Sequence, residues 1–149
     1  MLLFQSYQFF YLKPFNHKKY EMQDLGKLIL RVCLGAFMLT HGWPKLMKLF
    51  AEGPIEFGDP IGLGPTLSLI MTVFAEVVCS ILLIIGYKTK WAAIPLAFTM
   101  LVAAIIVHGD DPFGRQEKAW LYAVGYIVIA LIGAGKHSLD GKFGKYQEG

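Results

Sequence analysis

Apolar residues in this chain form four long runs that are separated by short polar segments. The runs cover residues 25–42, 65–86, 91–108 and 117–135. Each is close to the roughly 20 residues that a helix needs to cross the hydrocarbon core of a bilayer. A segment in lipid must satisfy its own backbone polar groups, so the runs predict helices and not strands. The short connections favour an all-α transmembrane bundle of four helices in up-down-up-down order.

The first run carries polar residues at helical spacing. Arg31, Met38 and Lys45 lie seven residues apart. The positions that complete the same stripe are Leu34, Gly35, His41 and Gly42. The opposite side consists of Ile29, Val32, Ala36, Phe37 and Leu39, and we expect it to face lipid. An ionisable group near the membrane centre costs at least ~2.5–3.5 kcal/mol, so Arg31 is expected to face protein or water and to have a partner.

Proline and glycine divide the rest of the chain. Pro44 is predicted to bend or restart the first helix, because it removes a backbone donor and crowds the preceding turn. Residues 45–50 then form a short amphipathic extension along the interface. Residues 51–64 and 109–118 are predicted to be loops, the former rich in Gly and Pro.

The composition supports a multi-pass membrane protein. Hydrophobic residues make up 55% of the 149 residues and charged residues 17%, against roughly 25% charged residues in a typical soluble domain. The net charge of +3 is spread over the flanks of the apolar runs, so nucleic-acid binding is not expected. Cys33 and Cys79 have no C-x-x-C spacing, and we interpret them as buried free thiols.

Lysine distribution predicts the orientation. On one side of the predicted bundle lie Lys13, Lys18, Lys19, Lys27, Lys88, Lys90, Lys136, Lys142 and Lys145. The other side has Lys45, Lys48, Arg115 and Lys118, together with acidic residues. The positive-inside rule therefore predicts that both the N and C termini lie in the cytoplasm.

Residues 1–21 stand apart, because they are rich in aromatic residues but too interrupted by polar groups to span a membrane. They are consistent with an interfacial anchor, a disordered tail or a start codon assigned too early, with Met22 as the true start. In the last case Asp24 would cap the first helix. The membrane domain is predicted over residues 22–142, and residues 143–149 form a C-terminal tail.

Four motifs resemble the DoxX family of small four-span bacterial membrane proteins. The first span contains L-x-L-R-x-x-x-G from Leu28 to Gly35, followed by H-G-x-x-K from His41 to Lys45. Glu76 precedes Gly86 by ten residues, and GAGKHSLD occupies residues 133–140. The resemblance covers residues 22–142, and it implies a multi-pass protein of the bacterial inner membrane. It implies similarity to the membrane subunit of thiosulfate:quinone oxidoreductase in one branch, and to membrane partners of redox and thiol-stress enzymes in others.

The first candidate site is an intramembrane polar centre. Thr72, Glu76 and Ser80 lie four residues apart on one stripe of the second span. At ~1.5 Å rise per residue, Arg31 lies ~9 Å and Glu76 ~15 Å above the cytoplasmic ends of their helices. We therefore predict a buried Arg31–Glu76 pair. It either locks the helices in register or acts on a quinone-like ligand or on protons.

The second candidate site is an outer-face polar cluster of His41, Lys45 and His108. Both histidines are expected near the outer ends of their helices at a similar level. Imidazole with a carboxylate can bind a metal or move protons, and a polar head group or an ordinary interfacial role is also open. No H-x-x-x-H spacing is present, so no metal is predicted.

Small and polar residues elsewhere favour structural roles. Gly35, Gly42 and the alanines of the third span are expected to permit close helix contact. Trp91, Trp120, Tyr122 and Tyr126 are interpreted as interfacial anchors or bundle core. Ser138 and Asp140 follow a predicted helix C-terminus and turn, and we do not interpret them as catalytic.

Two functions remain from the sequence. One is a membrane subunit or partner of a quinone- or thiol-linked oxidoreductase system, and the other is a non-enzymatic scaffold or assembly factor. No motif for haem, flavin or an iron–sulfur cluster is present, so no covalently bound group is expected. The resemblance, together with the polar stripe in the apolar bundle, implies quinone as the cofactor. The expected partners are the lipid bilayer, a soluble redox enzyme and further copies of the chain. A small transporter is less favoured, because four spans leave little room for a pathway.

Overall fold

The computed structural model describes the backbone of residues 2–144 and the side chains of residues 20–144. Within this part of the chain every regular element is a helix, which confirms the all-α prediction. The elements are α1 (Leu2–Leu49), α2 (Pro65–Val73), the π-helix η1 (Phe74–Cys79), α3 (Ser80–Ile85), α4 (Thr89–Val102), the π-helix η2 (Ala103–Val107), α5 (Phe113–Ile132) and α6 (Leu139–Phe143).

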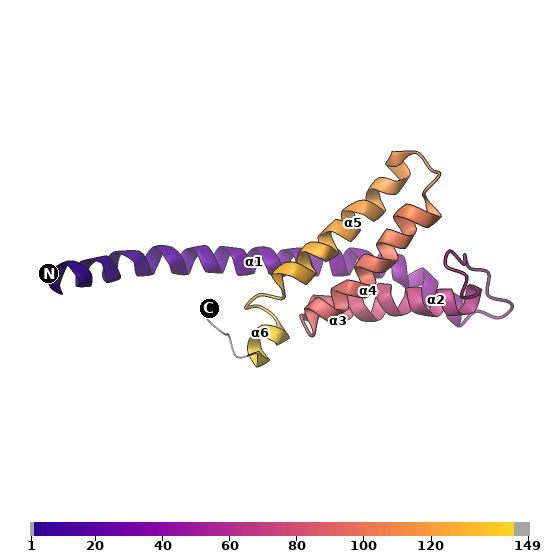
Figure 1. The fold of residues 1–149 in the computed structure, drawn as a ribbon. Coiled ribbons are helices and arrows are strands. Elements are labelled where there is room, and N and C mark those ends of the chain that lie inside the picture. Colours follow the sequence, from indigo (N-terminus) through magenta and orange to yellow (C-terminus); the bar gives the residue numbers. More distant parts are fainter. Residues whose placement is uncertain (1, 145–149) are drawn as a thin grey trace.

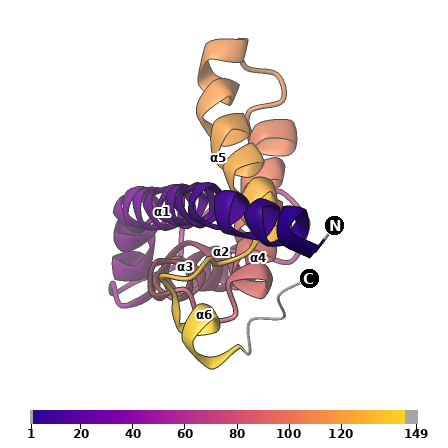
Figure 2. The same cartoon turned by 90° about the vertical axis from the view of Figure 1, so that its left-hand side faces the viewer.

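The helices form two inclined pairs. The α2, η1 and α3 segments make one rod that runs back along the second half of α1 (Figure 1). The α4–α5 hairpin crosses this pair at an incline and rises away from it in the view along α1 (Figure 2). The first half of α1 extends beyond the other helices (Figure 1). The two pairs are therefore packed together along only part of their length.

Three helical stretches among the described residues are long and apolar enough to cross a membrane: Tyr20–Leu49, Pro65–Ile85 and Thr89–Val107. They agree with the first three predicted spans. The fourth predicted span corresponds to α5, whose first turns contain Arg115, Glu117 and Lys118. The prediction of a loop over residues 109–118 is wrong in its second half, because the helix already begins at Phe113, directly after Pro112.

The prediction that Pro44 restarts the first helix is wrong, since α1 continues through it to Leu49. Packing accounts for this continuation. Leu46 and Leu49 lie against the buried cluster that includes Leu69 and Val77. Burial of these side chains offsets the backbone hydrogen bond that Pro44 cannot make.

The predicted stripe on α1 is largely confirmed. Arg31 and Met38 are fully buried, and Gly35 and Gly42 are buried between them. On the other side of the helix Phe37 is 57% exposed, as expected for a lipid-facing position. His41 differs from the prediction, because its side chain is exposed and not buried with the rest of the stripe.

Glycines on α1 allow the close contact that the sequence predicts. A Cβ added to Gly35 would lie 2.6 Å from Ile84 Cγ1 and 3.0 Å from the Ser80 carbonyl oxygen. A Cβ added to Gly42 would lie 2.8 Å from Val77 Cγ2 and 2.9 Å from the Glu76 Cβ. Because later residues of α1 meet earlier residues of the second rod, these contacts also establish that α1 and the rod are antiparallel.

The π-helix η1 interrupts the second rod over Phe74–Cys79, a range that includes Glu76. A π-turn accommodates an extra residue per turn, and such turns are frequent at functional sites. The hydrophobic pattern did not predict this irregularity, because the apolar run continues through it. The π-turn changes the phase of the residues that follow, including Ser80.

Candidate functional site

Arg31 is buried against the end of α3. Its Nη1 donates to the carbonyl oxygens of Leu83 at 2.9 Å and Ile84 at 3.0 Å, and Nη2 donates to that of His137 at 2.6 Å. The last carbonyls of a helix have no partner within the helix, and the dipole of the helix favours a cation there. The carbonyl oxygens at the C-terminus of α3 therefore take the place of the carboxylate that we expected to pair with Arg31.

The predicted Arg31–Glu76 pair is therefore wrong. The error lies in the register, because the predicted depths assumed that the first helix starts near Leu25, level with the end of the second. In the structure α1 extends far past that level, and Arg31 lies beside Ile84. Glu76 lies farther along the pair, opposite Gly42.

The segment after α5 completes the Arg31 corner. Asp140 caps the start of α4, since its carboxylate accepts the backbone N–H groups of Lys88 at 2.7 Å and Thr89 at 2.8 Å. Its own N–H donates to the Gly86 carbonyl oxygen at 2.8 Å. Gly86 has φ 72, and an added Cβ would collide with Arg31 Nη1, so this position requires glycine. Asp140 has the structural role that the sequence suggested.

Asp24 does not cap the start of a helix, since it lies inside α1. Its Oδ1 accepts the Lys136 N–H at 3.2 Å and lies 3.8 Å from Lys27 Nζ. The turn after α5 is thus fixed to α1 at two points, through Asp24 and through Arg31.

Glu76 pairs with Lys45. Lys45 Nζ lies 2.5 Å from Glu76 Oε1, and the two side chains are 31% and 1% exposed. The contact of Gly42 with the Glu76 Cβ brings α1 close enough for the lysine of the next turn to reach the carboxylate. The pair thus connects a fully buried acid to a partly exposed base.

Polar atoms beside this pair have no protein partner. Among the described residues, the buried side-chain atoms without a hydrogen bond are Glu76 Oε2, Ser80 Oγ, Arg31 Nε and Thr89 Oγ1. Thr72 is satisfied, because its hydroxyl donates to the Ser68 carbonyl oxygen at 2.8 Å. Buried polar groups nearly always have a partner, so an open carboxylate oxygen and an open hydroxyl one helical turn apart mark a candidate ligand site. Of the predicted centre, Glu76 and Ser80 remain and Arg31 and Thr72 do not.

The predicted cluster of His41, Lys45 and His108 is not assembled. Lys45 turns to Glu76, and the His41 ring meets the edge of Tyr122 with centroids 5.9 Å apart. His108 Nδ1 lies 2.8 Å from Asp111 Oδ2. Among residues 20–144, His108 makes no hydrogen bond, ion pair or ring contact with the other two, and the α4–α5 hairpin inclines away from α1 (Figure 1). Within the same residues no group of three or more His, Cys, Asp or Glu side chains could hold a metal ion.

Aromatic rings continue from His41 into the core. Tyr122 stacks on Tyr126 at 6.0 Å, and the Tyr126 hydroxyl donates to the Leu34 carbonyl oxygen at 3.2 Å. These aromatic residues were predicted to be interfacial anchors or part of the bundle core. Tyr126 is fully buried, so it belongs to the core. Trp91 is 74% exposed and fits the prediction of an interfacial anchor.

Two loop carboxylates outside the predicted sites make local hydrogen bonds, Asp59 as a cap and Asp111 to side chains. Asp59 accepts the N–H groups of Leu63 and Gly64, both at 2.8 Å, and the Ser68 hydroxyl at 2.8 Å. The hydrogen bonds from Ser68 and Gly64 lower the pKa of Asp59. The Asp-Pro dipeptide five residues before the helix start was the available signal. At the other loop, hydrogen bonding to His108 lowers the pKa of Asp111.

The cysteines are both free, and they differ in burial. Cys79 is buried in η1, whereas Cys33 is exposed on α1. The prediction that Cys33 is buried is wrong, because it lies on the side of α1 that faces away from the second rod.

Comparisons with known proteins agree with this architecture. Residues 26–109 match the DoxX family. The chain is 31% identical over 118 residues to a Bacillus subtilis (strain 168) protein named "Putative oxidoreductase CatD", covering 78% of this chain and 86% of that one. It is 28% identical over 123 residues to inner membrane protein YphA of Escherichia coli (strain K12), covering 76% and 86%. No solved structure matches the chain.

A Haemophilus influenzae (strain Rd) protein of unassigned role is 32% identical over 140 residues, covering 87% of this chain and 98% of that one. The relatives that are named as inner membrane proteins, together with the apolar helices, place this protein in the bacterial inner membrane. The family match covers more than half of the chain, and the relatives span most of it. The chain belongs to the DoxX family.

Proposed function

We propose that this protein is the membrane subunit, or a membrane partner, of a quinone-linked oxidoreductase system, and that the ligand binds at Glu76. The observation that carries the proposal is the open Oε2 of Glu76, whose side chain is 1% exposed, beside the open hydroxyl of Ser80. The π-turn at this position adds support. The name of the CatD relative also points to redox chemistry.

The proposed topology has four spans with both termini in the cytoplasm. With 20 residues α5 is ~30 Å long, enough to cross if its charged first turns lie in the outer interface. Lys88, Lys90 and Lys136 then lie at the cytoplasmic side, in agreement with the positive-inside rule. Reporter fusions at the 51–64 loop and after residue 144 test this arrangement.

The donors and acceptors near Glu76 fit a quinone head group. Its two carbonyl oxygens accept hydrogen bonds, and Lys45 Nζ and Ser80 Oγ are donors. The reduced quinone carries hydroxyl groups, and the open Glu76 Oε2 can accept a hydrogen bond from one of them. When bound, a quinone supplies two-electron, two-proton redox chemistry that the side chains of this chain lack.

Each residue then has a separate task. Glu76 holds or releases a proton at Oε2, while Lys45 keeps Oε1 paired and orients the carboxylate. Ser80 positions a carbonyl oxygen with its hydroxyl. Met38, fully buried in the neighbouring cluster, helps to keep water away from the acid.

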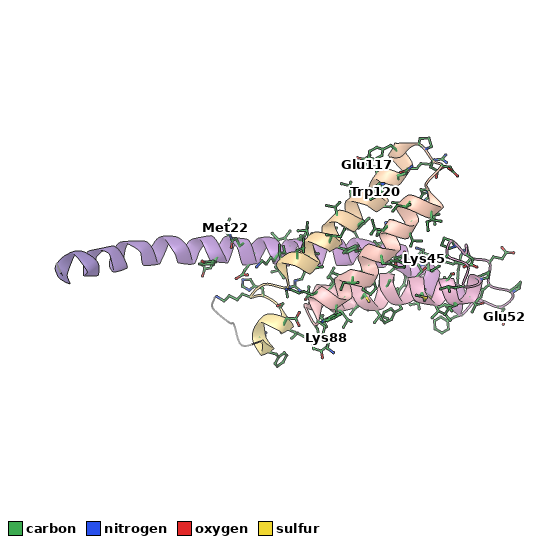
Figure 3. All side chains as sticks on the ribbon, viewed as in Figure 1. Met22, Lys45, Glu52, Lys88, Glu117 and Trp120 are labelled. Atoms are coloured by element: carbon green, nitrogen blue, oxygen red, sulfur yellow. The ribbon has the colours of Figure 1, made fainter. Side chains whose placement is uncertain are left out.

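The test is photolabelling of the purified full-length protein with an azido-quinone, with and without a short-chain quinone as competitor. We expect a competed label within residues 72–84, and a loss of at least about tenfold in Glu76→Gln and Ser80→Ala. Glu52→Gln is the matched control, because Glu52 is exposed in the loop beyond α1 (Figure 3). The proposal would be contradicted if the competitor did not reduce the labelling, or if Glu76→Gln left the labelling unchanged.

A non-enzymatic scaffold is the second candidate, favoured by the way the Lys45–Glu76 pair joins α1 to η1. A buried ion pair can fix the register of two helices without any ligand. In that case Glu76→Gln would lose stability and quinone labelling would be absent in the wild type. In the redox case Glu76→Gln stays folded and loses the label.

A further inference from the structure

Three lysines surround the turn after α5, at the end of the α1–α3 pair that lies away from Glu76. They are Lys27 of α1, Lys90 at the start of α4 and Lys136 of the turn itself, and we name them the lysine corner. A Cβ added to Gly135 would lie 3.1 Å from Lys27 Cδ, and one added to Gly133 would lie 3.3 Å from Lys90 Cε. The stems of two lysines from different helices therefore lie against the same turn.

The turn is held in place independently of these lysine side chains. Asp24 Oδ1 accepts the Lys136 N–H at 3.2 Å, and Arg31 Nη2 donates to the His137 carbonyl oxygen at 2.6 Å. Gly133 and Gly135 have φ 74 and 75, which a left-handed turn requires. The three cations are thus presented from a fixed backbone, which lowers the entropy cost of binding a shared anion.

The corner carries excess positive charge. Asp24 lies 3.8 Å from Lys27 Nζ and is 8% exposed. Glu21 lies one turn earlier on α1. The Asp140 carboxylate, close to Lys90, accepts from the backbone N–H groups of Lys88 and Thr89. The side chain of Lys27 is 27% exposed, and Lys90 and Lys136 are exposed. Within residues 20–144 the ion pair made by these three lysine side chains is Lys27–Asp24, so most of their positive charge is available to an external anion.

Exposed apolar side chains adjoin the corner. Trp91 and Ile94 at the start of α4 are 74% and 53% exposed, and Leu131 at the end of α5 is 73% exposed. Because α4 and α5 form an antiparallel hairpin, these two ends lie together (Figure 1). A cationic corner that continues into an apolar surface fits a ligand with an anionic head and apolar tails.

We infer that the lysine corner binds the phosphate of an anionic phospholipid whose acyl chains lie along α4 and α5. A free phosphate would satisfy the cations and would gain nothing from Trp91 or Leu131. The site is distinct from Glu76, and the inference does not depend on the proposed redox function.

The test titrates phosphatidylglycerol, phosphatidylcholine or glycerol 3-phosphate into the full-length protein in a neutral detergent. Thermal unfolding and native mass spectrometry of retained lipid are the two readouts. We expect phosphatidylglycerol alone to stabilise the wild type. The half-saturating concentration should rise about fivefold for Lys90→Gln or Lys136→Gln and about thirtyfold for both together. Lys90→Arg with Lys136→Arg should keep wild-type binding.

The matched controls are Lys48→Gln and Lys118→Gln, which remove exposed lysines from the opposite end of the molecule. Equal effects of the control and corner variants would overturn the inference, because attraction would then follow net charge alone. Equal stabilisation by phosphatidylcholine would exclude recognition of the anion. Equal stabilisation by glycerol 3-phosphate would exclude the lipid as the source of the phosphate. Since the corner lysines are exposed or partly exposed, their variants are expected to unfold at the wild-type temperature without lipid.

Discussion

Two buried charges lie where α1 meets the second rod, Arg31 on α1 and Glu76 on η1, and their surroundings differ. Among residues 20–144 no carboxylate forms an ion pair with Arg31, yet three backbone carbonyl oxygens accept from its Nη atoms. Glu76 has a lysine in contact, yet one of its oxygens and the nearby Ser80 hydroxyl have no partner. Charge pairing alone therefore does not separate a structural site from a candidate functional one. Arg31 Nε is open too, but at Glu76 an acceptor oxygen and the hydroxyl of Ser80, four residues later, are open together, as a ligand with both a donor and an acceptor would need.

Helix ends explain the difference. Arg31 lies where α3 ends, so unpaired carbonyl oxygens are available within reach. Glu76 lies in the middle of a rod, where backbone groups are used by the rod itself, apart from the irregular π-turn. A charge in the second setting can be satisfied only by another side chain or by a ligand.

The largest expected effect is that of Arg31→Met. The carbonyl oxygens of Ile84 and His137 would lose the Arg31 donor, at about 1–3 kcal/mol for each buried acceptor. That of Leu83 would keep only the Gly86 N–H at 3.2 Å. We expect a loss of at least about 3 kcal/mol in the free energy of unfolding, measured by denaturant titration in detergent. Arg115→Gln is the control, because the Arg115 side chain is 73% exposed. A loss of stability below about 1 kcal/mol would contradict the structural role of Arg31.

The next effect concerns which partner of the Lys45–Glu76 pair is removed. Lys45→Met leaves a carboxylate that is 1% exposed, whereas Glu76→Gln leaves a lysine that is 31% exposed and can turn to solvent. We expect Lys45→Met to cost about 2–4 kcal/mol and Glu76→Gln about 1 kcal/mol in the same assay. The double variant should recover part of the loss. Equal costs would indicate that Glu76 reaches water by another route.

A smaller effect tests the contact that brings the pair together. Gly42→Ala would place a methyl group 2.9 Å from the Glu76 Cβ, so α1 must shift. We expect a loss of about 1–3 kcal/mol and weaker quinone labelling. Gly26→Ala is the matched control in the same helix, since nothing lies within 4 Å of its added Cβ. That change should be neutral or stabilise by up to about 1 kcal/mol.

The smallest effect is a pH dependence at the Asp59 cap. Its pKa is lowered in the folded protein by the hydrogen bonds from Ser68 and Gly64. The stabilisation is therefore fully present above the unfolded pKa of about 3.9, and is lost as pH falls through the lower folded pKa. The midpoint temperature of thermal unfolding should fall less steeply between pH 7 and pH 3 in Asp59→Asn than in the wild type. Identical slopes would exclude a contribution from this cap.

The errors of the sequence prediction share one cause. The stripe on α1, the antiparallel second rod and the close glycine contacts followed from spacing in the sequence. The partner of Arg31 could not be predicted from spacing, because it depends on the register of the two helices. A change of about six residues along α1 moves a side chain by ~9 Å, which is enough to exchange one partner for another.

The dispersal of His41 and His108 has a similar origin. Both were expected near the outer ends of their helices, and hydropathy carries no information on the angle between helix pairs. The inclination of the α4–α5 hairpin separates them (Figure 1). Membrane assignment of α5 and the domain limits at residues 22 and 142 stay predictions.

The sequence alone determined that this protein is helical, resides in a membrane and resembles the DoxX family, because hydrophobic length and residue spacing are local properties. It also identified Glu76, Ser80 and Lys45 as residues of interest. Only the tertiary structure decided that Lys45 pairs with Glu76, that helix-end carbonyls hold Arg31 and that the lysine corner forms around one turn. These contacts join residues far apart in the chain, and they depend on helix register and inclination, which packing of the whole molecule sets.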